Sequence, residues 1–362
     1  MSNDYPDDLL EAENLQESEE DFSETPPSDI VAFNELRSCA DLLRMYEKSQ
    51  LIIQPDFQRD VVWKRPAQTR FIDSLVKQLP IPSMCLSLDY KTGERLMIDG
   101  LQRISSIINF MTDDDWRLSN LEDIDSRISG RTPGYIRKHY YDVYSRVENL
   151  TIPVTVLRCD YSKKSHMHYL FTIFHRLNTG GNKLSNQEIR NCIFHGRFNE
   201  MLKRVVNQSS FRSLFSLEDG ESYRFSYEEL VLRIVAFSEK YEEYRGRLAK
   251  FLNDFMDSKK NISEDELSYL ESALNKSVDL VYNKIMDGRP LPKLSKATTE
   301  SIFVGILINI DSLVDLDRAS LQARMADLRS DDLFSVENLK EGLSAKEKVQ
   351  ARIGRAVEIF SE

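Results

Sequence analysis

Met97-Ile98-Asp99-Gly100-Leu101-Gln102-Arg103 marks the point at which a predicted strand becomes a predicted helix. The run ERLMID at residues 94–99 has the apolar content of a strand, and Gly100 permits a tight turn after it. Apolar residues then recur at helical spacing, so we expect a helix that buries Leu101, Ile104, Ile107, Ile108 and Met111. Gln102 and Arg103 lie in the first turn of that helix.

The start of this helix is a predicted anion site. The free N–H groups of a helix N-terminus and the positive end of its dipole favour an anion. Arg103 opposes that dipole by about 0.3–1 kcal/mol unless an anion lies between them. Phosphate fits this role, because a guanidinium group binds phosphate in bidentate fashion. Asp99 has several candidate roles: capping the helix, orienting Arg103 or supporting a metal ion. The plainer alternative is that Asp99 only caps the helix and Arg103 only pairs with a nearby carboxylate.

The segments around this turn predict an α/β arrangement. MCLSLDY at residues 84–90 and ERLMID form a predicted hairpin around Lys91-Thr92-Gly93, and LTIPVTVLRC at 150–159 predicts another strand. A helix follows Pro66 and ends at Pro80-Ile81-Pro82. Further helices are expected over 165–176, after the capping box Ser185-x-x-Glu188, and around Leu36, Leu42, Leu43 and Tyr46.

Beyond about residue 220 the apolar pattern is helical throughout. Three further capping-box candidates begin predicted helices: Ser226-x-x-Glu229, Ser263-x-x-Glu266 and Ser344-x-x-Glu347. The predicted fold class is therefore α+β. It consists of an α/β domain at residues 30–200 followed by an all-helical domain at residues 201–362.

The negative charge of the chain lies in its first residues. The 362 residues carry 59 Asp and Glu against 48 Lys and Arg, a formal charge of −11. All of the excess lies in residues 1–29, which contain no Lys or Arg and end near Pro26-Pro27. We expect this segment to be a disordered acidic tail. Because the rest of the chain is balanced, the overall charge does not argue against a nucleic-acid partner.

Several classes of protein are disfavoured by the sequence. No charged, apolar leader is present, and the apolar run IFVGILI at residues 302–308 is far shorter than the roughly 20 residues of a membrane span. We expect no membrane partner. The four cysteines have no C-x-x-C spacing, which favours reduced thiols in a cytoplasmic protein. No pattern of metal-ligating residues stands out.

Two further motifs are rich in polar side chains. Residues 54–63 combine Gln58 and Arg59 with two aromatic residues, which could grip a base or a sugar or, read more plainly, anchor a core. Residues 174–181 (FHRLNTGG) contain Arg176, Asn178 and Thr179. A helix C-terminus is sufficient to explain the glycines of that run, but it does not explain the polar cluster.

Taken together, three runs resemble one family in order and spacing: PDFQRDVVWKRPAQTRFIDSLVKQLPIP, LMIDGLQRISSIINF and FHRLNTGGNKLSNQEIRN. This family is named after the N-terminal domain of the GmrSD restriction endonucleases, and its hallmark is a D-G-Q-Q-R motif. The resemblance covers roughly residues 35–200. It implies a fold similar to ParB and sulfiredoxin, with binding or hydrolysis of a nucleoside triphosphate (NTP) at the hallmark.

The resemblance also implies the site residues. Asp99, Gln102 and Arg103 fall on the hallmark and would carry the catalysis. The implied nucleotide-binding residues are Gln58, Arg59, Gly100, Arg103, Arg176, Asn178 and Thr179. Leu101 replaces the first Gln of the hallmark, which leaves phosphate binding by Arg103 in place but removes any catalytic role of that Gln. The chain also lacks the H-N-H nuclease domain that restriction relatives append.

The leading hypothesis is a nucleotide-binding, NTP-hydrolysing protein in DNA-directed defence of the anti-phage or restriction type. Its expected partners are an NTP, DNA and a separate nuclease subunit, with Mg²⁺ as a candidate cofactor. The alternative is a non-enzymatic module that binds DNA or a partner and works with a separate nuclease. A third hypothesis is a metal-dependent DNA nickase. The preferred base and the oligomeric state are left open.

Overall fold

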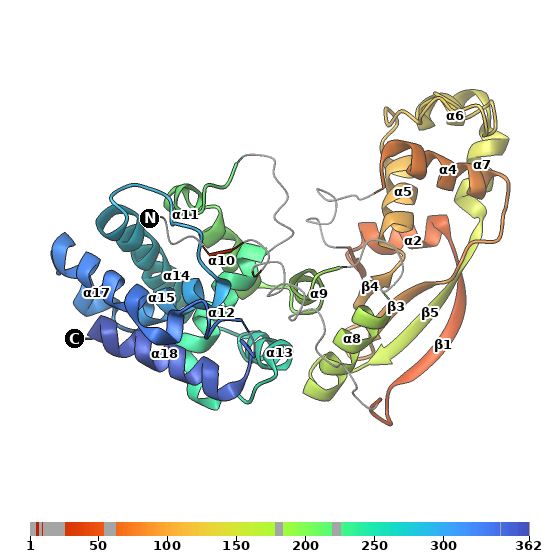
Figure 1. The fold of residues 1–362 in the computed structure, drawn as a ribbon. Helices are drawn as coiled ribbons and strands as arrows, with labels where there is room; N and C mark the ends of the chain where they lie inside the picture. Colours follow the sequence, from red (N-terminus) through yellow and green to blue (C-terminus); the bar gives the residue numbers. More distant parts are fainter. Residues whose placement is uncertain are drawn as a thin grey trace. The chain divides into compact units, whose positions relative to one another are not determined.

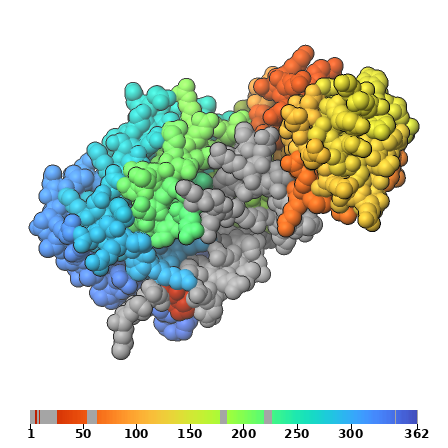
Figure 2. All heavy atoms as spheres, turned by 90° about the horizontal axis from the view of Figure 1, so that it is seen from above, coloured from red at the N-terminus to blue at the C-terminus, as the bar shows by residue number. Residues whose placement is uncertain are grey.

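The chain folds into two compact units. The computed structural model describes residues 5–6, 9, 26–53, 63–177, 184–218, 226–340 and 342–361. One unit comprises residues 22–184, and the other joins residues 1–21 to residues 185–362. In the space-filling view, the orange to yellow residues pack together, as do the green to blue residues (Figure 2). From the sequence we placed the division after residue 200; in the structure it lies between residues 184 and 185.

The unit of residues 22–184 is built on a mixed five-stranded sheet (Figure 1). Its strands, in spatial order, are β1 (Val31–Ser38), β5 (Thr151–Cys159), β3 (Met84–Asp89), β4 (Arg95–Asp99) and β2 (Leu51–Ile52). β1 is antiparallel to β5, and β3 is antiparallel to β4. β3 runs parallel to β5 and β2 runs parallel to β4. The hairpin predicted around residues 91–93 is therefore present.

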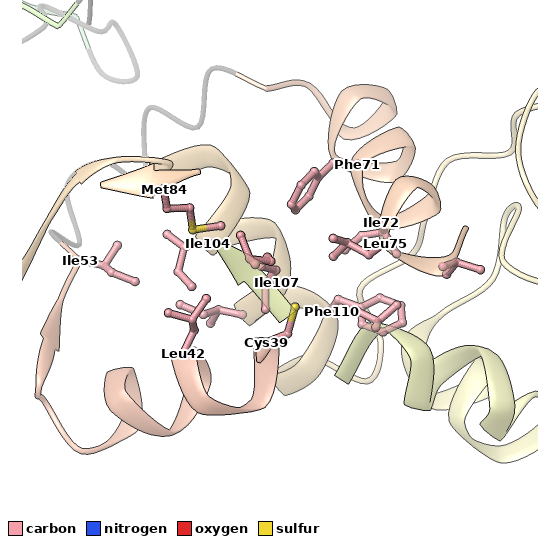
Figure 3. Packing of buried hydrophobic residues seen from close by; sticks show 14 of the residues in the cluster. Cys39, Leu42, Ile53, Phe71, Ile72, Leu75, Met84, Ile104, Ile107 and Phe110 are labelled. Atoms are coloured by element: carbon pink, nitrogen blue, oxygen red, sulfur yellow. The ribbon is translucent and has the colours of Figure 1, made fainter. Parts of the chain in front are cut away.

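Helices cover the sheet because alternate strand residues are apolar. Met84 and Leu86 of β3 belong to the main core, together with side chains from α2 (Cys39–Glu47), α4 (Arg65–Val76), α5 (Leu101–Thr112) and α7 (Tyr141–Asn149). Figure 3 shows Leu42, Ile72, Ile104 and Ile107 of this core meeting beside Cys39 and Phe110. The described residues of this unit also form α6 (Pro133–His139) and α8 (Lys164–Leu177), and α8 contacts β4.

The first predicted helix was placed too early. Leu36, assigned from the sequence to a helical face, lies in β1 and is 67% exposed. The helix begins only at Cys39, where the Ser38 hydroxyl accepts a hydrogen bond from the Asp41 N–H at 3.0 Å. β1 exists because it pairs along its whole length with β5, more than a hundred residues away. The local spacing of apolar residues does not indicate that pairing, because the partner strand is remote in sequence.

The second unit is all-helical in the part that the structure describes. Its α-helices are α9 (Asn186–Ile193), α10 (Arg197–Val206), α11 (Ser209–Leu214), α12 (Ser226–Lys240), α13 (Leu248–Ser258), α14 (Glu264–Asp279), α15 (Lys296–Ile308), α16 (Ile310–Leu313), α17 (Arg318–Ser330) and α18 (Lys346–Ser361). A π-helical segment, Leu280–Ile285, extends α14. The α+β class expected from the sequence is thereby confirmed.

Capping explains several helix starts in this unit. Ser185 and Glu188 form both halves of the predicted capping box of α9. Ser263 caps α14 by accepting from the Glu266 N–H. α18 begins at Lys346, one residue later than the capping box predicted at Ser344 would place it, and the Ser344 carbonyl accepts a hydrogen bond from the Tyr244 hydroxyl.

The centre of this unit is α15, whose residues Ala297–Leu307 are all buried. Gly305 lets α18 approach closely, since a Cβ at this position would lie 2.7 Å from the Ala356 carbonyl oxygen.

Parts of the segment expected to be a disordered tail are packed. Tyr5 is buried against Ala297 and Leu339, and its N–H donates to the Lys293 carbonyl oxygen at 2.9 Å. Asp29 accepts a hydrogen bond from His166 Nε2 at 2.9 Å and pairs with Lys163. Residues 1–4, 7–8 and 10–25 lie outside the described residues. In the described part of the chain, no helix is both long enough and apolar enough to cross a membrane.

Replacing a core residue of the sheet unit tests the packing in Figure 3. Ile107 is fully buried, so Ile107→Ala leaves a cavity and should lower the free energy of unfolding by about 2–5 kcal/mol. Leu79 is 48% exposed, so Leu79→Ala should change it by less than about 0.5 kcal/mol. Urea unfolding measures both. Equal losses would contradict this arrangement of the core.

The pairing of Asp29 predicts an acid-sensitive contact between the start of the sheet unit and α8. Hydrogen bonds from Lys163 and then His166 lower the pKa of Asp29 from 3.8 to about 2. The contact should therefore stabilise the fold above about pH 4 and be lost as the pH falls toward 2. Asp29→Asn should flatten the dependence of the free energy of unfolding on pH between about pH 4 and 2. Near pH 7 to 8 the slope of that dependence should stay unchanged. Acid titration followed by circular dichroism measures this, and an unchanged acid limb in the variant would refute it.

Candidate functional site

The turn between β4 and α5 is the centre of the predicted site. β4 ends at Asp99, Gly100 has φ +106°, and α5 begins at Leu101. Residues with a side chain rarely adopt this φ, and a Cβ on Gly100 would lie 2.8 Å from Cγ of Met84. Glycine therefore serves two purposes here: it reverses the chain, and it lets β3 pass close to the turn.

The start of α5 is not capped by a side chain. Gly100 occupies the cap position and has no side chain to accept from the first N–H groups. Asp99, for which capping was one of the open roles, does not cap the helix. Its carboxylate accepts a hydrogen bond from Arg103 Nη2 at 2.8 Å. The first turn thus presents N–H groups together with the helix dipole, which is the arrangement that attracts an anion.

Arg103 is held by three acceptors on two segments of the chain, the end of β4 and the segment before β3. Besides Asp99 at the end of β4, its Nη1 donates to the Pro82 carbonyl oxygen at 2.5 Å, and its Nη2 to the Ser83 carbonyl oxygen at 3.3 Å. The Arg103 side chain is 13% exposed, and that of Asp99 is 42% exposed. The plainer expectation, in which Arg103 pairs with a nearby carboxylate, describes this contact.

These contacts do not use the whole guanidinium group. Arginine carries five N–H donors in a planar fork, and three of them are engaged with Asp99, Pro82 and Ser83. The N–H on Nε and one on Nη1 have no acceptor among the described residues. Arg103 is therefore fixed in orientation and keeps donors for a ligand.

Gln102 faces a different neighbour. Its Oε1 accepts a hydrogen bond from the backbone N–H of Trp63 at 3.3 Å, and the Trp63 ring packs edge-on against Phe71, with centroids 5.7 Å apart. Gln102 thus connects the first turn of α5 to the last residue of the 54–63 motif, which also contains Gln58 and Arg59. Gln58 and Arg59 themselves lie outside the described residues.

The third motif is described only at its start. Arg176 is exposed in the last turn of α8, the helix that contacts β4. Asn178 and Thr179 lie outside the described residues. Within the described part of the chain, the structure thus brings together Asp99, Gly100, Gln102 and Arg103.

Sequence reasoning missed the contribution of the segment before β3. The carbonyl groups of Pro82 and Ser83 hold Arg103, whereas this segment was read only as the end of a helix. Its signal is Pro80-Ile81-Pro82: an extended run with two prolines offers carbonyl acceptors but few N–H donors. Ser83 Oγ also lies 3.1 Å from the Thr155 hydroxyl, which donates to Asn34 and so links β3 to β5 and β1.

The chemistry available at this turn does not include a reactive thiol. Cys85 lies opposite Asp99 in the β3–β4 pairing. Burial and then the Asp99 charge raise the pKa of Cys85 to about 12, so the thiol stays protonated near neutral pH. Among the described residues, no group of three or more His, Cys, Asp or Glu side chains lies close enough to hold a metal ion. The described groups suit anion binding through N–H donors.

Comparison with known proteins agrees with this geometry. Residues 39–195 match the GmrSD restriction endonuclease, N-terminal domain. This stretch is a GmrSD-type N-terminal domain. The match spans β2 to β5 and the turn with Asp99 and Arg103, so the family expected from the sequence motifs is confirmed for this part of the chain. Because this family is named after a restriction endonuclease, the match indicates a restriction or defence role. No curated protein and no solved structure matches the chain.

Gly100→Ala tests the turn of the GmrSD-type domain. The new Cβ meets both an unfavourable φ and Met84, so we expect a loss of about 1–3 kcal/mol in the free energy of unfolding. Gly93 is a matched control, because it also has positive φ (+78°) but nothing within 4 Å of an added Cβ. Chemical denaturation should show the larger loss for Gly100→Ala. Equal losses would contradict the close passage of Met84.

Proposed function

We propose that the GmrSD-type domain binds a nucleoside triphosphate, with its phosphates at the start of α5, and hydrolyses it. The observation that carries this proposal is the uncapped first turn of α5 with Arg103 held over it. A phosphate oxygen there would accept from the helix N–H groups and from the guanidinium group at the same time. Such a ligand would also relieve the unfavourable placement of a cation at a helix N-terminus.

Asp99 and the carbonyl groups of Pro82 and Ser83 act as positioning groups in this proposal. They keep the guanidinium plane in one orientation, so little side-chain entropy is lost when phosphate binds. Asp99 also competes with phosphate for Arg103, because both are anions. We therefore expect the ion pair to loosen when a nucleotide is bound.

Gln102 is the proposed group for positioning the attacking water or a phosphate oxygen. Its carbonyl oxygen is used by Trp63, which orients the amide and leaves its NH₂ end to donate. In hydrolysis, water attacks the γ-phosphorus, and the bond to the bridging oxygen of the nucleoside diphosphate breaks. Arg103 would stabilise the negative charge that develops on the transferred group. Arg176, Gln58, Arg59, Asn178 and Thr179 are proposed to contact the rest of the nucleotide.

Mg²⁺ fits this site as a companion of the phosphates. Magnesium in such sites commonly takes one or two carboxylates, with phosphate oxygens and water completing the shell. Asp99 is the carboxylate at this turn, and it is already engaged with Arg103. The residues present therefore suit a metal that arrives with the nucleotide better than one bound to the protein alone.

The biological role proposed for this chemistry is DNA-directed defence of the restriction type. The support is the domain match, whose family takes its name from a restriction endonuclease. In this proposal, nucleotide binding and hydrolysis switch the protein between two states, and DNA cleavage belongs to a separate nuclease subunit. DNA is the proposed regulator of hydrolysis.

Arg103→Ala tests the nucleotide site directly. Loss of hydrogen bonds from a charged group costs about 1.5–3 kcal/mol, so nucleotide affinity should fall about 10- to 100-fold and phosphate release should fall to background. Asp99→Asn removes the competing anion and should keep or raise nucleotide affinity. Calorimetric titration with each of the four common NTPs and Mg²⁺ measures affinity, and phosphate release with and without DNA measures hydrolysis.

Arg44→Ala is the matched control for these variants. Arg44 lies on α2 of the same unit and pairs with Asp41 at 2.6 Å, but it is exposed and distant in sequence from the turn. It should leave both readouts unchanged. The proposal fails if folded Arg103→Ala and wild-type protein bind all four NTPs equally or not at all. Tight binding without phosphate release would contradict the proposed hydrolysis, whereas salt-sensitive DNA binding without nucleotide dependence would support the non-enzymatic alternative.

A further inference from the structure

The helical unit contains a cavity that plays no part in the proposed NTP site. Its volume is about 440 Å³, within the range of roughly 300–1,000 Å³ typical of pockets for small molecules. It lies among the end of α11, the first two turns of α12, the segment before α15 and the start of α15 (elements labelled in Figure 1). The described residues that line it all belong to this one unit.

One side of the cavity is apolar and aromatic. Phe215 and Tyr227 lie with ring centroids 5.2 Å apart, and Phe215 also stacks against Phe303 of α15 at 6.1 Å. The other apolar residues of the lining are Leu230 of α12 and Leu291, Pro292 and Leu294 of the segment before α15. Such a surface suits a flat apolar group, because aromatic rings contribute large contact area at low entropic cost.

The walls of the cavity are tied together without a ligand. The Leu291 N–H donates to the Leu214 carbonyl oxygen at 2.8 Å, which joins the segment before α15 to the end of α11. The Lys293 carbonyl oxygen accepts from the Tyr5 N–H at 2.9 Å. Ser295 caps α15 by accepting from the Thr298 N–H at 2.9 Å. The cavity is therefore preformed, as small-molecule sites usually are.

The charged residues of the cavity favour an anion. Of the described lining residues, Arg233, Lys293 and Lys296 are cationic and Glu229 is anionic. Glu229 is itself shared between two buried arginines, accepting from Arg233 Nη2 at 2.7 Å and from Arg190 Nη1 at 2.9 Å. Burial raises the pKa of Glu229, but Arg233, Arg190 and Lys296 outweigh this and keep it ionised. Arg233 also lies 3.7 Å from the Glu300 carboxylate, and the described lining residues comprise three cations and one anion.

We propose that this cavity binds a small organic anion in which a flat aromatic or heterocyclic group carries one phosphate or carboxylate. The flat group would lie against Phe215, Tyr227 and Leu230. Its anionic group would face Lys293 and Lys296 at the start of α15, where the helix dipole adds to the attraction. This site is separate from the α5 turn, and the inference does not depend on NTP binding there.

Calorimetric titration of the full-length protein tests this site. The probes are the ribonucleoside and deoxyribonucleoside 5′-monophosphates, their parent nucleosides, indole-3-acetate and inorganic phosphate. At least one of the organic anions should bind, and about tenfold more tightly than its uncharged parent or inorganic phosphate, because both halves of the ligand contribute. Binding by the monophosphates alone identifies the ligand class as nucleotides, whereas binding by indole-3-acetate alone identifies it as aromatic carboxylic acids.

Substitutions locate the binding in the cavity. Leu230→Trp fills the apolar side and should abolish binding, and Lys296→Gln should weaken it about tenfold. Lys276→Gln, an exposed lysine on α14 outside the lining, should have no effect. Arg103→Ala should also have no effect, which separates this site from the α5 turn. Thermal unfolding confirms that each variant is folded.

Three results would overturn the inference. The first is that no organic anion in the panel binds the wild-type protein. The second is that inorganic phosphate binds as tightly as the organic anions, which would indicate attraction to surface charge. The third is that binding survives in folded Leu230→Trp, or is lost in Arg103→Ala but kept in Lys296→Gln.

Discussion

The ion pair between Arg103 and Asp99 is the contact on which the functional end of the sheet unit depends. It joins the last residue of β4 to the first turn of α5, and the same guanidinium group holds the carbonyl groups of Pro82 and Ser83 at the start of β3. One side chain therefore orders a strand, a helix and the segment that enters the sheet. Gly100 makes this possible, because only a residue without Cβ turns here without striking Met84.

The same contact explains how a cation is tolerated at a helix N-terminus. Alone, Arg103 would oppose the helix dipole by about 0.3–1 kcal/mol. The Asp99 carboxylate offsets that cost in the absence of a ligand, and a phosphate could offset it when bound. Because either anion could satisfy the same guanidinium group, a nucleotide bound at the proposed site would replace Asp99 as the partner of Arg103.

The two units use buried charge in different ways. At the α5 turn, Asp99 remains 42% exposed, so its pair with Arg103 can exchange partners with solvent or ligand. In the helical unit, the buried Arg190 and Arg233 share Glu229 beside the cavity, and breaking one of these contacts would leave a buried charge unpaired. The first arrangement is suited to a site that changes state, and the second to a rigid wall.

Local sequence patterns were sufficient wherever the structure depends on neighbouring residues. The hairpin of β3 and β4, the helix after Gly100, the capping box of α9 and the Ser263 cap of α14 all follow from residues within a few positions of one another. The family was likewise recognisable from its motifs. The errors arose where distant residues decide the structure: Leu36 was assigned to a helix, whereas it lies in β1, whose partner β5 is remote in sequence. Similarly, Tyr5 was assigned to a disordered tail because its partners, Ala297 and Leu339, lie far along the chain.

By itself, the sequence determined the α+β class and the strand–turn–helix at Asp99–Arg103, and it predicted an anion site at that turn. These follow from backbone preferences and from the chemistry of a few adjacent side chains. Only the tertiary structure decided that Asp99 pairs with Arg103 instead of capping α5, that Pro82 and Ser83 hold the guanidinium group, and that the helical unit has a cavity lined by Arg233, Lys293 and Lys296. Each of these results from packing segments that are remote in sequence, and the energy of such contacts is not encoded in any local pattern.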